Sequence, residues 1–283
     1  MTLLQRFWVA VCLGNLWWGI ATAEPSGVAM SLTPAVQNAA QQPVEAPDGA
    51  VKPPLSIAVA ANFAGPLQVL LPAFEQASGI NTRVTAGSSG ALYAQIQHGA
   101  PYDVFLSADS MRPRALVNSG KISADAVTTY TIGQLALVGN VTGLTDAALL
   151  TDTVRIAIAD PGLAPYGRAA QELLEALGIW SALQSRLIRG NNVQQTLQFW
   201  QTGNVDVALI AGSQCITYQL DCKPVPALYE PVVQQMAVVA SNQVAQAEAA
   251  RSLARYLRSE AVQQQLTAMG YRAVTDITSR GGL

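Results

Sequence analysis

The sequence is poor in the residues that carry most metal and acid–base chemistry. It contains one histidine, His98, and three cysteines in 283 residues. Because Cys12 lies in an apolar N-terminal run, only Cys215 and Cys222 remain beyond it. Two thiolates and one distant histidine make an incomplete set of ligands for zinc. We therefore expect no cofactor and no metal ion held directly by protein ligands.

Charge is also scarce. Asp, Glu, Lys and Arg together make up 12% of the chain, the formal net charge is −2, and the basic residues form no blocks. Nucleic-acid binding needs a clustered positive surface, so the sequence argues against a nucleic-acid partner. Hydrophobic residues make up 50% of the chain, which is enough for sizeable cores in two modest domains.

The N-terminus is typical of a secretory signal peptide. Arg6 precedes an apolar run over residues 7–20, and the small residues Ala21-Thr22-Ala23 follow. The run is shorter than the roughly 20 residues of a membrane-spanning helix. We therefore predict a signal peptide over 1–23, cleaved near Ala23. Residues 24–54 are rich in Pro, Ala and Gln without periodicity, which predicts a disordered leader.

Export would place the two remaining cysteines in an oxidising compartment. Cys215 and Cys222 lie close together in the sequence, so we predict that they form a disulfide. Closing so short a loop is worth about 2.5 kcal/mol in the chain-entropy model. We expect the bridge to tighten one local turn rather than to hold the fold together.

From Leu55 onward, short apolar segments alternate with amphipathic ones. This alternation predicts an α/β fold, with mainly parallel sheets and right-handed helical crossovers. We predict strands at 55–60, 80–86, 103–107, 132–138, 155–159, 185–189, 205–210 and 235–240, and helices at 66–77, 91–98, 166–177, 193–202, 243–258 and 261–269. These are too many strands for one small sheet. We predict two lobes with a ligand cleft between them, lobe 1 from 55–133 plus 241–278 and lobe 2 from 134–240.

Four turns lead from a predicted strand into a predicted helix. They are Ala60-Ala61-Asn62-Phe63, Gly87-Ser88-Ser89-Gly90, the segment 160–167 and Gly190-Asn191-Asn192-Val193. The first turn of a helix has N–H groups without intrahelical partners and a partial positive charge, so it attracts anions without Lys or Arg. An Asn or Ser there adds a side-chain donor. Each turn alone is also explained by an N-cap, a glycine turn or a packed tyrosine, but two from each lobe favour an oxyanion receptor.

An enzyme is the first alternative. A serine hydrolase would use Ser88 or Ser89 as nucleophile, but His98 lies on the same predicted helix about 13 Å from Ser89 along its axis. A nucleophile and its base must lie near 3 Å. Neither Gly-x-Ser-x-Gly nor Ser-x-x-Lys surrounds these serines, so we expect no enzymatic activity.

The charged residues near the turns have ordinary explanations. A receptor for an organic acid would need an arginine clamp, and Arg83, Arg168 and Arg189 lie near the turns in sequence. We expect these arginines to be solvated surface charges. Asp109 and Asp160 would repel a dianion, so we expect them to brace the adjoining turns.

The chain resembles the periplasmic molybdate-binding proteins, the receptor components of ABC transporters for molybdate and tungstate. The resemblance runs from about Leu55 to Tyr271. It is carried by the turns at 60–63 and 87–90, by residues 99–109 and by the Asp-Pro…Pro-Tyr-Gly stretch at 160–167. It implies a type II periplasmic-binding-protein fold and a periplasmic monomer that delivers molybdate or tungstate to a membrane permease. Another oxyanion such as sulfate, or a small organic acid, is the alternative ligand.

The same resemblance implies the ligands of the anion. Ala61 and Asn62 would hold it from the first turn, Ser89 from the second, and Tyr166 with the backbone at Val193 from the other lobe. Molybdenum would be bound only as its oxyanion, through these residues and without direct metal ligands.

The sequence departs from the usual family pattern near these positions. Many members of the family have Ser in place of Asn62, Tyr in place of Ala211 and a small residue in place of Tyr166. The resemblance therefore implies that a hydroxyl has moved from position 211 to position 166.

Overall fold

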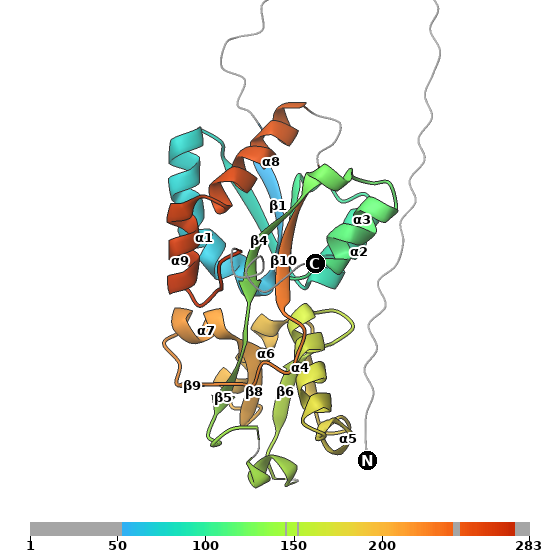
Figure 1. Cartoon of the computed structure of the whole chain (residues 1–283), viewed down its shortest axis with the longest axis vertical. Helices are drawn as coiled ribbons and strands as arrows, with labels where there is room; N and C mark the ends of the chain where they lie inside the picture. The colour runs from blue at the N-terminus through green and yellow to red at the C-terminus, as the bar shows by residue number, and fades with distance from the viewer. Residues whose placement is uncertain (1–52, 145, 152, 240–243, 275–283) are drawn as a thin grey trace, which may run out of the picture. The chain divides into compact units, whose positions relative to one another are not determined.

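The computed structural model describes residues 53–144, 146–151, 153–239 and 244–274. The predicted signal peptide (1–23) and nearly all of the predicted leader (24–54) lie outside these residues. The described part forms two five-stranded sheets, each flanked by helices (Figure 1). The predicted α/β fold of two lobes is confirmed.

The first sheet has the strand order β2-β1-β3-β10-β4. Strands β1, β2 and β3 are parallel, whereas β10 runs antiparallel to both β3 and β4. We call this sheet and its helices the first lobe. Its elements are β1 (Leu55–Ala60), α1 (Ala61–Ser78), β2 (Thr82–Gly87), α2 (Ser89–Gln97), β3 (Val104–Ser107), α3 (Met111–Asn118), the 3₁₀ helix η1 (Ala124–Ala126), β4 (Val127–Gly133), β10 (Val232–Val238), α8 (Val244–Leu257) and α9 (Glu260–Ala268).

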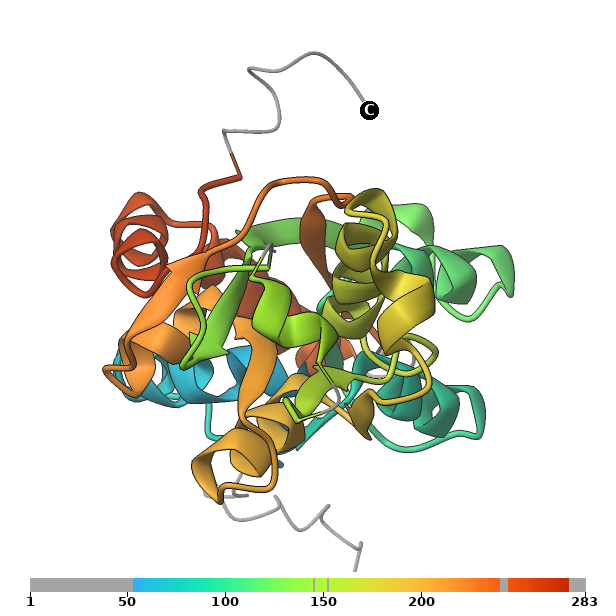
Figure 2. The same cartoon turned by 90° about the horizontal axis from the view of Figure 1, so that it is seen from below.

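The second sheet repeats this arrangement with the order β7-β6-β8-β5-β9, in which β5 is the antiparallel strand. Viewed from below, this second lobe lies towards the viewer, coloured green to orange (Figure 2). Its elements are β5 (Leu135–Gly139), the 3₁₀ helix η2 (Ala147–Leu150), β6 (Ile156–Ala159), α4 (Pro165–Ala176), α5 (Trp180–Leu183), β7 (Ile188–Gly190), α6 (Val193–Gln201), β8 (Val207–Ala211), α7 (Gly212–Thr217) and β9 (Cys222–Pro224).

Both faces of β1 are buried. Leu55, Ile57 and Val59 pack with residues of α1, α8 and α9, whereas Ala58 packs with α2 and α3. Successive side chains of a strand point to opposite faces, so a continuous apolar run suits a strand that is covered on both sides. The second lobe has a core of its own, built mainly from β5, β6, β8, α4 and α6. No helix among the described residues is long and apolar enough to cross a membrane.

Two connections cross between the sheets. The predicted strand 132–138 is wrong as a single strand, because β4 ends at Gly133 in the first sheet and β5 begins at Leu135 in the second. Figure 1 shows the two as one green path from sheet to sheet. The chain returns after β9, and the N–H of Leu135 donates to the Tyr229 hydroxyl (3.0 Å), which ties the two crossings together.

The return crossing changes the predicted division into lobes. The predicted second lobe, 134–240, includes the strand predicted at 235–240, but β10 lies in the first sheet between β3 and β4. A local apolar pattern predicts a strand and not the sheet that the strand joins. The first lobe is therefore built from two separate segments, whereas the second sheet is built from one.

Helix α1 begins at Ala61, earlier than the predicted start at 66, and contains Pro66 and Pro72. A proline cannot donate to the carbonyl four residues before it. For Pro66 that carbonyl belongs to Asn62, and the buried hydroxyl of Tyr271 donates to it instead (2.8 Å). A tyrosine from the C-terminal segment thus replaces the missing bond, and the helix can start directly at the end of β1.

The predicted disulfide is confirmed. Cys215 in α7 is bonded to Cys222 at the start of β9, with a sequence separation of 7. Helix α7 in turn holds α6, because Gln214 Nε2 donates to the carbonyl of Val193 (3.3 Å) and to Gln194 Oε1 (3.0 Å).

Replacing both cysteines with serine should lower the free energy of unfolding by about 2.5 kcal/mol, the chain-entropy value for so short a loop. Urea denaturation of the variant and of the wild-type protein measures this difference. Reductant should weaken the wild-type protein by a similar amount and leave the variant unchanged. A variant as stable as the oxidised wild-type protein would contradict the prediction.

Candidate functional site

Four helices begin beside one small cavity. Helices α1 and α2 of the first lobe and α4 and α6 of the second start just beyond the carboxyl ends of β1, β2, β6 and β7. The space in it that is open to the centre of a water-sized sphere is about 10 Å³. Its lining residues are Ala60, Ala61, Asn62, Gly87, Ser88, Ser89, Ala108, Ala164, Pro165, Tyr166, Asn192 and Val193. All five residues predicted to hold the anion are among them, and they come from both lobes.

Helices α2 and α6 are capped by side chains. Ser88 Oγ accepts the N–H of Ala91 (3.2 Å), and Asn192 Oδ1 accepts the N–H of Gln195 (3.0 Å). These caps satisfy the third N–H of each helix. The first N–H, which belongs to Ser89 in α2 and to Val193 in α6, has no partner within its helix.

Helices α1 and α4 start without a side-chain cap. Their N-cap residues are Ala60 and Ala164, which have no polar side chain. The early N–H groups of these helices, including those of Ala61 and Tyr166, also lack intrahelical partners. A helix start without a cap attracts an external acceptor, and most strongly an anion.

Two buried hydroxyls on the lining already accept hydrogen bonds from the protein. Ser89 Oγ accepts the N–H of Ala108 (2.9 Å). Tyr166 Oη accepts from Gln234 Nε2 (3.3 Å), and Asn62 Nδ2 lies 3.5 Å away. Each hydroxyl therefore keeps its own proton for donation. Burial raises the pKa of Tyr166 well above its ordinary value, so its hydroxyl stays protonated.

The side chain of Asn62 is turned into the protein. Its Nδ2 donates to Gln234 Oε1 (3.1 Å) and to Tyr271 Oη (3.3 Å). These contacts occupy the amide protons, so the side chain is not the donor that an Asn at this turn was expected to supply. The backbone N–H of Asn62, at the second position of α1, is what this residue can offer to the cavity.

The described residues that line the cavity are all uncharged. Among the described residues, no group of three or more His, Cys, Asp and Glu side chains could hold a metal ion. The donors that the described lining offers to an anion are therefore neutral.

Comparison with known proteins identifies the family. Residues 55–272 match the family described as bacterial extracellular solute-binding protein. This chain is a member of that family. The molybdate-binding protein ModA of Rhodobacter capsulatus is 35% identical over 219 residues (76% of this chain, 86% of that protein), and ModA of Azotobacter vinelandii is 34% identical over 226 residues (77% and 89%).

A solved structure agrees with these relatives. The periplasmic molybdate-binding protein of Azotobacter vinelandii matches with a TM-score of 0.68 and 34% identity, covering 77% of this chain and 98% of that one. The resemblance inferred from the sequence is thereby confirmed.

In this solute-binding protein the two aspartates near the cavity brace their turns, as predicted. Asp160 Oδ1 accepts the N–H of Gly162 (2.8 Å), and Asp109 Oδ1 accepts the N–H of Arg112 (3.0 Å). Neither side chain lines the cavity.

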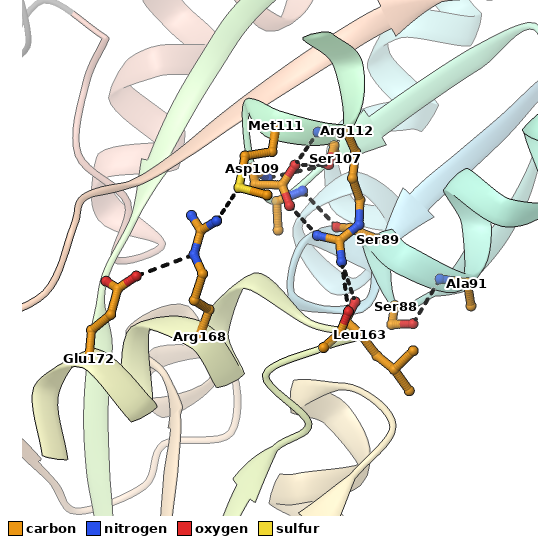
Figure 3. Close-up of polar contacts among 12 residues, drawn as sticks. Ser88, Ser89, Ala91, Ser107, Asp109, Met111, Arg112, Leu163, Arg168 and Glu172 are labelled. Atoms are coloured by element: carbon orange, nitrogen blue, oxygen red, sulfur yellow. Dashed lines mark hydrogen bonds and ion pairs between the residues drawn. The ribbon is translucent and has the colours of Figure 1, made fainter. Parts of the chain in front are cut away.

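In this solute-binding protein, the cavity is also not lined by Arg83, Arg168 or Arg189, the arginines that lie near the turns in sequence. Arg83 and Arg189 are exposed, as predicted. Arg168 pairs with Glu172 on its own helix (3.3 Å), and its guanidinium also contacts the sulfur of Met111 in the first lobe (Figure 3). An arginine clamp formed by these side chains is therefore absent from the lining.

One residue beside the site, Arg112, was not predicted from the sequence. The guanidinium of Arg112, at the start of α3, pairs with Asp109 and donates to the carbonyls of Gly162 (3.2 Å) and Leu163 (3.3 Å) in the second lobe (Figure 3). The Leu163 carbonyl also accepts the N–H of Gly90 in α2 (2.9 Å). This group of contacts joins the two lobes next to Ser89. No local signal could have found it, because 50 residues separate Arg112 from Gly162.

Proposed function

We propose that this protein binds molybdate, a compact tetrahedral dianion, in the cavity at the four helix starts and delivers it to an ABC-transporter permease. The observation that carries the proposal is the convergence of neutral donors from both lobes on a cavity without a charged lining residue. The choice of anion is supported by the two relatives named molybdate-binding proteins at 34–35% identity. Tungstate, which is nearly equal to molybdate in size, is expected to bind as well.

The proposed ligands are backbone N–H groups and two hydroxyls. The N–H groups belong to Ala61, Asn62, Ser89 and Val193, and the hydroxyls to Ser89 and Tyr166. About six charge-assisted bonds of roughly 1.5 to 3 kcal/mol each give a gross stabilisation of about 9 to 18 kcal/mol. Micromolar affinity needs only about 8 kcal/mol. The difference offsets the dehydration of the anion and the closure of the lobes.

The same donors distinguish anions by size rather than by charge. A smaller sulfate ion would leave donors at the edge of the cavity unpaired, and each unpaired donor costs about 1 to 3 kcal/mol. No carboxylate on the lining can accept the proton of a protonated phosphate, so that ion is disfavoured too.

The proposal is for a receptor and not for an enzyme. His98 is the exposed C-cap of α2, at the opposite end of that helix from Ser89, where it cannot act as a base for the serine. We further propose that the protein is exported by its signal peptide and acts as a periplasmic monomer.

Isothermal titration with molybdate, tungstate, sulfate and phosphate tests the proposed ligand. We expect similar affinities for molybdate and tungstate and, for the other two anions, affinities lower by at least about 100-fold, equivalent to one or two unpaired donors. Equal heats for all four anions, or none, would reject the specificity. Displacement of molybdate by a small carboxylic acid would favour the organic-acid alternative.

Molybdate affinity should be independent of pH between about pH 6 and pH 9. The lining carries no His, Asp or Glu, and burial raises the pKa of Tyr166 well above its ordinary value of about 10. Because the pKa of Tyr166 lies above this pH interval, its hydroxyl stays protonated and remains a donor from about pH 6 to pH 9. Titrations in buffers across this range measure the effect. A tenfold change in affinity would reveal a titrating group in the site.

A further inference from the structure

We propose that Gln234 is a positioning residue that aims the Tyr166 hydroxyl at the bound anion. The inference rests on the proposed function, because it explains how one of the proposed ligands is oriented. Gln234 is absent from the residues predicted from the sequence, and it does not line the cavity.

Gln234 is buried in a strand of the first sheet that follows the second lobe in the sequence. It is in β10, at an irregularity where the pairing of β10 with β4 shifts register between Gln234 and Gln235. Its exposed fraction is 0%. A buried amide must have hydrogen-bond partners for both its oxygen and its nitrogen, and the partners of Gln234 come from both lobes.

The oxygen of the Gln234 amide has two donors. Tyr130 Oη donates to Oε1 (2.9 Å), and Asn62 Nδ2 donates to it (3.1 Å). If the amide were turned over, its nitrogen would face the nitrogen of Asn62, with no acceptor between them. With Asn62 oriented so that its Nδ2 donates to Gln234 and Tyr271, Nε2 of Gln234 faces the hydroxyl of Tyr166 at 3.3 Å.

The direction of each tyrosine proton follows from these contacts. Tyr130 donates to Gln234, and Tyr271 donates to the carbonyl of Asn62 (2.8 Å). Tyr166 Oη is the exception because it accepts from Gln234 and lies within 3.5 Å of Asn62 Nδ2. Because the Gln234 amide N–H occupies the side of this hydroxyl that faces the protein interior, the O–H of Tyr166 is left to point away from it, and Tyr166 lines the cavity.

The space around this contact is limited. A Cβ atom added to Gly133 would lie 2.0 Å from Tyr166 Oη and 2.7 Å from Gln234 Nε2. The missing side chain at Gly133 therefore makes room for the contact between the two groups. Because Tyr166 belongs to α4 of the second lobe, the amide of Gln234 connects the first lobe to a donor of the second.

A double-mutant cycle tests the proposal, with molybdate affinity measured by titration. Gln234→Met should weaken binding about tenfold, the effect of losing one well-oriented hydrogen bond. Tyr166→Phe should weaken it by a similar or larger factor. In the Tyr166→Phe background, Gln234→Met should have no further effect, because the hydroxyl that it positions is gone. The matched control is Gln235→Met, since Gln235 is only half-buried and bonds to Thr129 (3.2 Å).

The outcomes separate the inference from the proposed function. If the wild-type protein does not bind molybdate, the proposed function fails and the inference fails with it. If it binds, but Gln234→Met weakens binding equally with and without the Tyr166 hydroxyl, Gln234 has only a structural role and the inference alone is overturned.

A second variant covers the case in which Gln234→Met does not fold. Gln234→Glu keeps an oxygen for Tyr130 and Asn62 and replaces the nitrogen that faces Tyr166. It should bind molybdate at least tenfold more weakly, and a carboxyl group at this fully buried position should lower the unfolding temperature. A folded Gln234→Glu variant with wild-type affinity would overturn the inference.

Discussion

Ser89→Asp is expected to abolish molybdate binding, with a loss of at least about 10³-fold, while the protein stays folded. One carboxylate oxygen can accept the N–H of Ala108, as Ser89 Oγ does (2.9 Å), and the other would enter the cavity. There it would occupy the same N–H donors as the anion and repel it. An unfavourable charge of this kind in a buried site costs several kcal/mol, and about 4 kcal/mol corresponds to 10³-fold.

The stability of the ligand-free variant separates lost binding from lost folding. A carboxylate at the first position of α2 interacts favourably with the N-terminus of the helix, which offsets part of the cost of placing a charge where Ser89 is buried. The ligand-free variant should therefore still unfold in one cooperative transition. Added molybdate should raise the melting temperature of the wild-type protein only. Ser259→Asp, at the N-cap of α9, adds the same charge outside the cavity and should bind normally. Strong molybdate binding by Ser89→Asp would exclude this cavity as the site.

Arg112→Gln is expected to weaken molybdate binding by roughly 10- to 100-fold, mainly through faster dissociation. The substitution removes the charged donor to the carbonyls of Gly162 and Leu163 across the lobes. It also leaves Asp109, whose side chain is 4% exposed, without its counter-charge. Stripping the partner from a buried carboxylate costs about 3 to 5 kcal/mol, and the uncompensated negative charge would lie close to a dianion.

Two further variants separate these causes. Adding Asp109→Asn to Arg112→Gln removes the unpaired charge and should restore part of the affinity, although the contacts between the lobes stay lost. Arg114→Gln on the same helix is the matched control, because Arg114 is exposed and should not affect binding. Stopped-flow dissociation and equilibrium titration measure both effects. An Arg112→Gln variant with the wild-type dissociation rate would show that this contact does not hold the lobes around the ligand.

The part of the site that could be predicted is the part encoded locally. Ala61 and Ser89 stand where a strand meets a helix, and that arrangement is visible within about ten residues of sequence. The neutral character of the lining follows from the same short turns, because they contain no Lys or Arg. The disulfide was predictable for the same reason, since its two cysteines are neighbours in the sequence.

The rest depends on contacts between distant residues. Gln234 meets Asn62 across 172 positions, and Tyr271 meets Asn62 across 209. Neither partnership leaves a periodic pattern or a motif. The early start of α1 was missed for this reason, because the bond that compensates for Pro66 comes from Tyr271. The sheet membership of β10 was equally hidden, since an apolar strand pattern fits either sheet.

In the sequence, the second lobe is inserted between the two segments of the first lobe, and this determines which fragments of the chain contain a complete sheet. All strands of the second sheet lie between Leu135 and Pro224. The first sheet, in contrast, is incomplete until β10, which ends at Val238, has been synthesised. An excised fragment over 134–224 contains a complete sheet, but an N-terminal fragment that stops at 133 does not. During synthesis, the first lobe therefore cannot complete its sheet until the whole second lobe has been made. If the chain is cut at the two crossings between the sheets, only the second lobe should be obtained as a fragment with a complete sheet.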